Sequence, residues 1–278
     1  MTASLIRADL HTHTNCSDGQ LTPDQLLAEA VEKGVQLFSI TDHDTLAAYR
    51  QLTILPPEGM KLLVGIELSC TWRRMTIHMI GLNLDAEAAS MLEAETKQGQ
   101  ARAQRYEKIL QRLTKAGLDI DTERLITLGG SCPGRPHIAR YLYETGQVKS
   151  ETQAFDKYLG QGKMGDVKEC WPDLSQAISW VQQAGGVAVL AHPIKYRLTR
   201  TKLIELCTEF KEAGGVGMEV ISGQQNPTQT KTLSDIAQKL ELLGSVGSDF
   251  HKPGQPWAVV GKVAALPPAV KPIWALFD

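Results

Sequence analysis

The sequence lacks any long apolar run. Its most apolar stretches, such as GGVAVLA at 185–191, are far shorter than the roughly 20 residues that a membrane-spanning helix needs. The N-terminal segment MTASLIRADLHTHT also lacks the apolar core of an export signal. We therefore expect a cytoplasmic protein that is not bound to a membrane.

Cysteine is scarce, odd in number and never arranged in a CxxC pair. The five thiols lie far apart in the sequence, at Cys16, Cys70, Cys132, Cys170 and Cys207. Scattered single cysteines are typical of reduced, buried side chains rather than of disulfides or a structural zinc site. This pattern also favours the cytoplasm.

The sequence also has no large excess of positive or of negative charge. The chain has 29 basic and 31 acidic residues and a formal net charge of −2. No global basic field exists to hold long nucleic acid, so a polyanion would have to be bound locally. With 42% hydrophobic and 22% charged residues over a length of 278, the chain is expected to be globular rather than disordered, collagen-like or a coiled coil.

Short β-like runs alternate with helical stretches in two parts of the sequence. In the first 80 residues SLIRADLHTHT, VQLFSITDHD, KLLVGIELSCTW and MTIHMIGLNL are expected strands, and TPDQLLAEAVEKG is an expected helix. Thr22 is its predicted N-cap, Pro23 its first residue, and Gly34 closes it. The alternation resumes after about residue 165. It indicates an α/β fold with a mostly parallel sheet.

Residues 86–165 have a helical pattern instead. We therefore expect one α/β barrel, residues 1–85 and 166–278, interrupted by a helical insertion, residues 86–165. Basic residues recur along its first helix at Lys97, Arg102, Arg105, Lys108, Arg112 and Lys115. A solvated face is the simpler interpretation, and a basic wall facing an anionic substrate is the alternative.

Histidine is the most informative residue type. Only seven are present, and six of them end or follow predicted strands beside acidic residues. His11 and His13 are two apart in an extended segment, so both imidazoles point to one face. The other histidines and the carboxylates of this pattern are Asp18, His43, Glu67, His78, His192, Asp249 and His251.

The carboxyl ends of parallel barrel strands lie at one edge, where catalytic residues of such barrels collect. A single histidine at a strand end is usually structural, but nine such groups would be costly to bring together without added positive charge. They exceed the three or four ligands of one open catalytic site, so two or three divalent ions are expected. Ligation by histidine and carboxylate without thiolate suits Mn²⁺, Zn²⁺ or Fe²⁺.

The motifs DLHTHTNCSDG, TDHD, GIE, TIH, AHP and GSDFH, in this order, resemble those of the PHP (polymerase and histidinol phosphatase) superfamily. The resemblance implies a distorted seven-stranded (β/α)7 barrel with a metal centre of three ions. It is closest to the branch with 3′,5′-nucleoside bisphosphate phosphatases and 5′-to-3′ exoribonucleases, which has the same helical insertion and a similar SDFHKPGQPW segment.

The resemblance also implies a ligand set. A first ion would be held by His11, His13, Glu67 and Asp249, and Glu67 would bridge to a second ion completed by His78 and His192. A third ion would take Asp18, His43 and His251. Asp18, His43, Glu67 and His192 are the candidates for catalysis, and Mn²⁺ is the favoured metal, with Zn²⁺ and Fe²⁺ as alternatives.

Hydroxide generated by the ions would attack phosphorus in line, without a covalent intermediate. In the insertion, Arg135 and His137 of RPHIAR are candidates for holding a neighbouring phosphate, although His137 could simply pack at a helix start. The expected substrates are 3′,5′-bisphosphates and short 5′-phosphorylated RNA cut in the 5′-to-3′ direction. No stable protein partner is implied. Tyr196 and Trp257 could stack on a base, but core packing is expected of both.

Two alternatives remain. A histidinol-phosphate phosphatase would have the same metal centre but no use for Arg135 and His137. A barrel without catalytic function is also known among PHP modules, although the complete ligand set argues against it. Beside His43, Asp42 is expected to orient the site, whereas Asp44 could equally cap a helix or lie at the surface.

Overall fold

The computed structural model describes residues 6–129, 133–168 and 170–277. Cys132 lies outside these ranges. The chain divides into two compact units. The first contains residues 1–72, 76–95 and 172–278, and the second contains residues 73–75 and 96–171. The boundary falls inside the long helix α3 (Ala89–Lys115).

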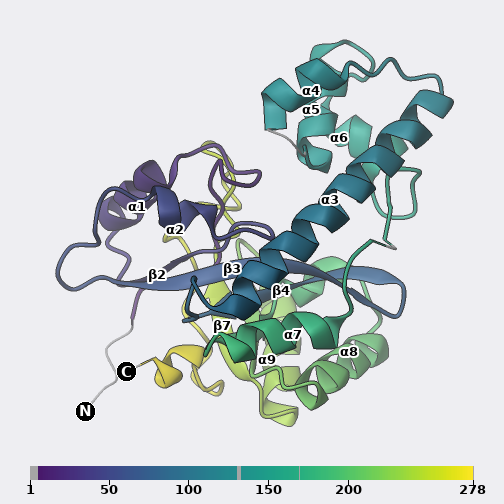
Figure 1. The fold of residues 1–278 in the computed structure, drawn as a ribbon. Helices are drawn as coiled ribbons and strands as arrows, with labels where there is room; N and C mark the ends of the chain where they lie inside the picture. The colour runs from purple at the N-terminus through teal and green to yellow at the C-terminus, as the bar shows by residue number, and fades with distance from the viewer. Residues whose placement is uncertain (1–5, 130–132, 169, 278) are drawn as a thin grey trace. The chain divides into compact units, whose positions relative to one another are not determined.

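Seven strands form the sheet of the first unit, in the order of the sequence (Figure 1). They are β1 (Ala8–Asp9), β2 (Leu37–Ile40), β3 (Lys61–Trp72), β4 (Met75–Leu82), β5 (Val187–Leu190), β6 (Gly217–Ser222) and β7 (Leu243–Gly247). Strands β1 to β3 are parallel, and so are β5 to β7. Strand β4 pairs antiparallel with β5, so the expected sheet is mostly but not wholly parallel.

The sheet closes into a nearly complete barrel where its first and last strands meet. The Leu10 N–H donates to the Val246 carbonyl at 3.0 Å, and the Asp249 N–H donates to the His11 carbonyl at 2.9 Å. The His13 N–H donates to the Phe250 carbonyl at 2.9 Å. The expected seven-stranded PHP-type barrel is thereby confirmed. The segments just after β1 and β7 lie side by side.

One buried apolar cluster takes side chains from all seven strands. It includes Ala8, Leu37, Leu63, Ile80, Val189, Ile221 and Val246. Ile273 of the short helix η3 (Ile273–Leu276) and Phe277 also join it. The last part of the chain therefore packs on the barrel core.

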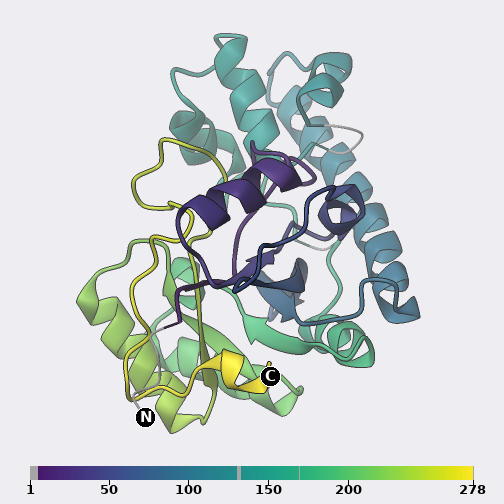
Figure 2. The same ribbon diagram turned by 90° about the vertical axis from the view of Figure 1, so that its left-hand side faces the viewer.

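Helices of the first unit cover the strands from outside. They are α1 (Pro23–Glu32), α2 (Ala47–Gln51), α7 (Leu174–Gln183), α8 (Arg200–Glu212) and α9 (Pro227–Lys239). Figure 2 shows α1, in purple, in front of the strands. Its start and end are as predicted: the Thr22 hydroxyl accepts the Gln25 N–H at 3.3 Å, Pro23 begins the helix, and Gly34 follows it with a φ of 67°.

The second unit is helical. Besides most of α3 it contains α4 (Thr122–Gly129), α5 (Arg135–Glu144), α6 (Glu151–Ala154) and the π-helix η1 (Phe155–Leu159). Its own apolar cluster includes Ile109, Leu113, Ile138, Leu142 and Leu159. None of the helices in the described ranges combines the length and apolar character needed to cross a bilayer.

Candidate metal centre

The nine predicted histidine and carboxylate residues meet in one pocket of the first unit. Within it, four groups of side chains have potential ligand atoms that lie within 4.8 Å of one another. The groups are His13, Asp18, His43 and His251; His11, Glu67 and His192; His11, His13 and Asp249; and His43, Glu67 and His78. Shared members link them, so the residues form one continuous cluster.

Backbone and hydroxyl contacts hold the His-Thr-His segment that follows β1. The Thr12 N–H donates to Oγ1 of Thr41 at 3.2 Å, and the Thr12 hydroxyl donates to the Ser39 carbonyl at 2.9 Å. The segment is held on its other side by the backbone bonds to the chain after β7. Thr12 therefore holds the backbone of this segment in place, and the imidazoles of His11 and His13 point into the cluster.

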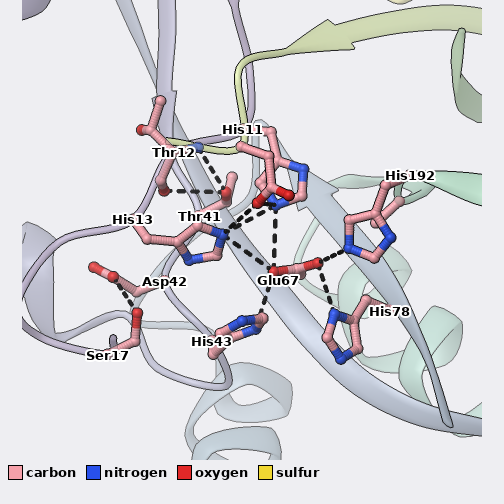
Figure 3. A network of polar contacts seen from close by, with 12 residues as sticks. His11, Thr12, His13, Ser17, Thr41, Asp42, His43, Glu67, His78 and His192 are labelled. Atoms are coloured by element: carbon pink, nitrogen blue, oxygen red, sulfur yellow. Dashed lines mark hydrogen bonds and ion pairs between the residues drawn. The ribbon is translucent and has the colours of Figure 1, made fainter. Parts of the chain in front are cut away.

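Glu67, on β3, lies at the centre of the cluster and is fully buried (Figure 3). Its Oε1 lies 2.9 Å from Nδ1 of His78 and 2.9 Å from Nε2 of His192. Its Oε2 is 3.3 Å from Nε2 of both His11 and His13, and 2.9 Å from Nδ1 of His43. One carboxylate thus contacts five imidazoles, with its two oxygens facing different sets.

The remaining carboxylates lie on the side of His13. Asp249 Oδ1 is 3.4 Å from Nε2 of His11 and 3.3 Å from Nε2 of His13. Asp18 is 3.3 Å from Nε2 of His251 and 3.8 Å from Nε2 of His43. The side chains of His43, His78 and His251 are 14–27% exposed, so the pocket opens to solvent along these three residues.

The arrangement fits divalent cations better than protons alone. Nε2 of His11 and Nε2 of His13 lie 3.1 Å apart, a separation that two ligands of one ion can also have. Among the described residues, Nδ1 of His13 and Nδ1 of His192 are buried with no hydrogen-bond partner. Ligands bonded to one ion at about 2.1 Å lie about 3.0–3.4 Å apart, which matches the separations in this cluster.

The carboxylates stay ionised in the cluster. Burial would raise the pKa of Glu67, but the imidazoles of His43 and His11 hold it well below its usual value. The same balance lowers the pKa of Asp18, through His251 and His43. Burial also opposes the charge of Asp249, yet the cation of Lys195 keeps its pKa well below normal. Ionised carboxylates are the form that binds a metal ion.

The histidines divide into two kinds. Burial lowers the pKa of His13 to about 3 and that of His78 to about 4. For His251, burial is outweighed by the charge of Asp18, which raises its pKa to about 9. Neutral imidazoles are the form that binds metal, so His13 and His78 are ready as ligands at neutral pH.

Glu219, on β6, is a member of the site that the sequence analysis missed. It is fully buried, and its Oε1 lies 3.0 Å from Nδ1 of His11. Its Oε2 accepts the backbone N–H of His192 at 2.5 Å. His192 has a φ of 28°, a conformation uncommon for a residue other than glycine. Glu219 thus supports two proposed ligands. Its only signal in the sequence is a lone acid inside the apolar strand GMEVIS.

Lys195 was also missed. It lies in the short helix η2 (Pro193–Tyr196), three residues after His192, and its Nζ contacts the Asp249 carboxylate. The Tyr196 hydroxyl accepts the His78 N–H at 2.8 Å and donates to the Ala191 carbonyl at 2.9 Å. Tyr196 therefore joins the middle of β4 to the chain just after β5.

Two aspartates anchor the turn that carries His43. Asp42 accepts the N–H and hydroxyl of Thr14 at 2.7 and 2.5 Å and the Ser17 hydroxyl at 2.6 Å, which holds the loop before Asp18. Asp44 is buried and accepts the N–H and hydroxyl of Ser69 at 2.6 and 2.9 Å. The surface role considered for Asp44 is therefore wrong, because it binds β3 next to Glu67.

Arg135 and His137 lie in the second unit, at the start of α5. Nη1 of Arg135 donates to the Leu159 carbonyl at 3.1 Å, and Nδ1 of His137 accepts the Gly134 N–H at 3.1 Å. His137 therefore caps its helix, and phosphate binding by the pair stays a prediction.

The basic residues of α3 are not all solvated. Arg105 is buried, donates to the Val167 carbonyl at 2.8 Å and lies over the Trp171 ring. A free basic wall is thus ruled out for this arginine. The expectation for Trp257 is also wrong, since its side chain is 57% exposed instead of packed in a core.

Comparisons with known proteins place these features in context. A family model described as PHP domain matches residues 9–178. The chain is 39% identical over 275 residues to the 5′-3′ exoribonuclease Rnm of Escherichia coli K12, covering 97% of this chain and 93% of that protein. It is 34% identical to the 3′,5′-nucleoside bisphosphate phosphatase of Chromobacterium violaceum, covering 96% and 94%.

A solved structure has a similar fold. A Chromobacterium violaceum protein described as an amidohydrolase, solved with bound sulfate and no metal, superposes with a TM-score of 0.87 at 34% identity. The match covers 97% of this chain and 95% of that one.

Proposed function

The chain belongs to the PHP family, and we propose that it is a metal-dependent phosphoesterase acting on 5′-phosphorylated nucleotides and RNA ends. It would hydrolyse the 3′-phosphate of a nucleoside 3′,5′-bisphosphate or the first 3′-phosphodiester of a short 5′-phosphorylated RNA. The main support for the proposal is the position of Glu67. Its two carboxylate oxygens lie 2.9–3.3 Å from five imidazoles.

The residues present fit two or three divalent ions, and a mixed set of histidine and carboxylate donors suits Mn²⁺, Zn²⁺ or Fe²⁺, of which we propose Mn²⁺. His11, His13 and Asp249 would hold one ion with Glu67. His78 and His192 would hold a second together with Glu67. Asp18, His43 and His251 would hold a third. Bound ions supply charge that stabilises phosphoryl oxygens and lower the pKa of water toward neutrality.

The protein's own residues would do the positioning. Asp18 and Glu67 stay ionised, which is the form that binds a cation. The exposed edges of His43, His78 and His251 leave room for a phosphate to approach. Arg135 and His137 would bind the 5′-phosphate, so that the neighbouring 3′ ester is the one hydrolysed.

A substrate panel with added Mn²⁺ tests this proposal. Adenosine 3′,5′-bisphosphate and 5′-phosphorylated hexaribonucleotides should release product, while the 5′-hydroxyl form of the same RNA and histidinol phosphate should react far more slowly. Preference for histidinol phosphate would favour the alternative phosphatase. Retention of metal without hydrolysis of any compound would favour a barrel without catalytic function.

A further inference from the structure

The loop after β5 and the first turn of α8 carry an exposed run of positive charge. Residues 195–202 contain four cationic side chains and no acidic one. All four residues are exposed. We refer to them as the basic segment: Lys195, Arg197, Arg200 and Lys202.

Most of this charge is not balanced by neighbouring carboxylates. In the part of the chain that the structure describes, Lys195 pairs with Asp249, but Arg197, Arg200 and Lys202 form no ion pair. Some other surface cations of the first unit are paired instead, as Arg50 is with Glu95 at 2.8 Å. Three unpaired like charges within six residues repel one another, so an anionic partner would be bound favourably there.

The basic segment begins at the candidate metal centre. Lys195 follows His192 by three residues, and its Nζ contacts Asp249. The chain after β5 therefore meets the chain after β7 at this point. Arg197 is two residues further and can lie at most about 7 Å from Lys195 along the chain. Its φ of 52° is uncommon for arginine, and its N–H donates to the Ile194 carbonyl at 3.4 Å. The basic segment therefore starts at a carboxylate of the cluster, and its next cation follows within about 7 Å along the chain.

We propose that the basic segment binds the phosphodiester backbone of RNA on the 3′ side of the bond that is cut. The inference rests on the proposed function and makes RNA the substrate that the protein binds more extensively than a nucleoside bisphosphate. A nucleoside 3′,5′-bisphosphate has no phosphate beyond the one at the metals, so Arg197, Arg200 and Lys202 would have nothing to bind. A continuing RNA chain presents one phosphate per nucleotide, and contacts with them need no base sequence.

The test removes the three unpaired charges together. The variant carries Arg197→Asn, because asparagine tolerates a positive φ, with Arg200→Gln and Lys202→Gln. A matched control removes three exposed cations from elsewhere in the same unit: Lys239→Gln, Lys262→Gln and Lys271→Gln. Thermal melts check that both variants fold.

Binding is measured first, without turnover. A 5′-phosphorylated, 3′-fluorescein decaribonucleotide is titrated in EDTA at KCl concentrations from 50 to 200 mM, and anisotropy gives the affinity. Each phosphate contact on a single strand contributes about 0.7 to the slope of log affinity against log salt. Loss of three contacts should lower the slope by about 2, so the same rise in salt should weaken wild-type binding about 20-fold more than the variant's.

Hydrolysis is measured second, with Mn²⁺. The kcat/KM for the decaribonucleotide should fall at least about tenfold in the variant, and that for adenosine 3′,5′-bisphosphate should fall much less. The control should match the wild type in both assays. An unchanged salt slope, no RNA binding by the wild type, or an equal loss on both substrates would overturn the proposal. If the wild type hydrolyses neither substrate, the proposed function fails, while the EDTA titration still decides whether the segment binds RNA.

Discussion

Replacing Glu219 with glutamine should weaken metal binding although Glu219 is not itself a proposed ligand. The carboxylate accepts from two donors at once, Nδ1–H of His11 at 3.0 Å and the backbone N–H of His192 at 2.5 Å. A glutamine has the same shape but only one accepting oxygen, so its NH₂ group would face one of these donors. In a fully buried place, each unsatisfied group costs about 1–3 kcal/mol.

Loss of such a partner of a ligating histidine typically reduces metal affinity or activity by about 10–100-fold. The change is measured by equilibrating the protein with buffered Mn²⁺, determining bound metal by mass spectrometry, and following hydrolysis of adenosine 3′,5′-bisphosphate. Glu212→Gln, on an exposed glutamate at the end of α8, is the matched control and should leave both unchanged. If Glu219→Gln binds metal and turns over within twofold of the wild type, Glu219 does not position these histidines.

Three further outcomes are expected. His11→Ala or Asp249→Ala should abolish turnover and reduce bound metal, because both residues belong to the same ligand group; full activity in either would contradict that grouping. Arg135→Ala should raise the KM for a bisphosphate about 10–100-fold, as loss of a charged hydrogen bond predicts, but change the KM for an aryl phosphate little; equal effects on both would remove its phosphate-binding role. Removal of metal by a chelator should lower the melting temperature by about 5–10 °C relative to protein in Mn²⁺ at about 100 times the dissociation constant. Added Mn²⁺ should restore the melting temperature, and no change on chelation would argue against bound metal.

Much of the barrel can be predicted from local patterns. The cap at Thr22, the proline start and the glycine end of α1 are signals that depend only on neighbouring residues. The antiparallel pairing of β4 is harder. The turn between β3 and β4 uses Arg73 and Arg74, both at positive φ, where glycine or asparagine usually signals a hairpin. Nothing in the sequence marks this turn.

In the site, too, some residues can be predicted from local sequence patterns and others cannot. Histidines that follow strands could be found because the carboxyl ends of parallel strands share one edge. Glu219 could not, since a lone acid in a buried strand has no meaning until the strand is placed beside His11. Whether an arginine has a partner also depends on tertiary contacts. Arg105 is stacked on Trp171, whereas Arg197 has no carboxylate partner in the described structure.

The meeting of the chain after β1 with the chain after β7 has a consequence for biosynthesis. The His11 carbonyl accepts the Asp249 N–H, so two of the proposed ligands that are far apart in the sequence are joined by their backbones. During translation the centre could assemble only after Asp249 and His251 had been synthesised. Fragments from interrupted translation would lack it, which keeps a potential RNA-degrading activity absent from incomplete products.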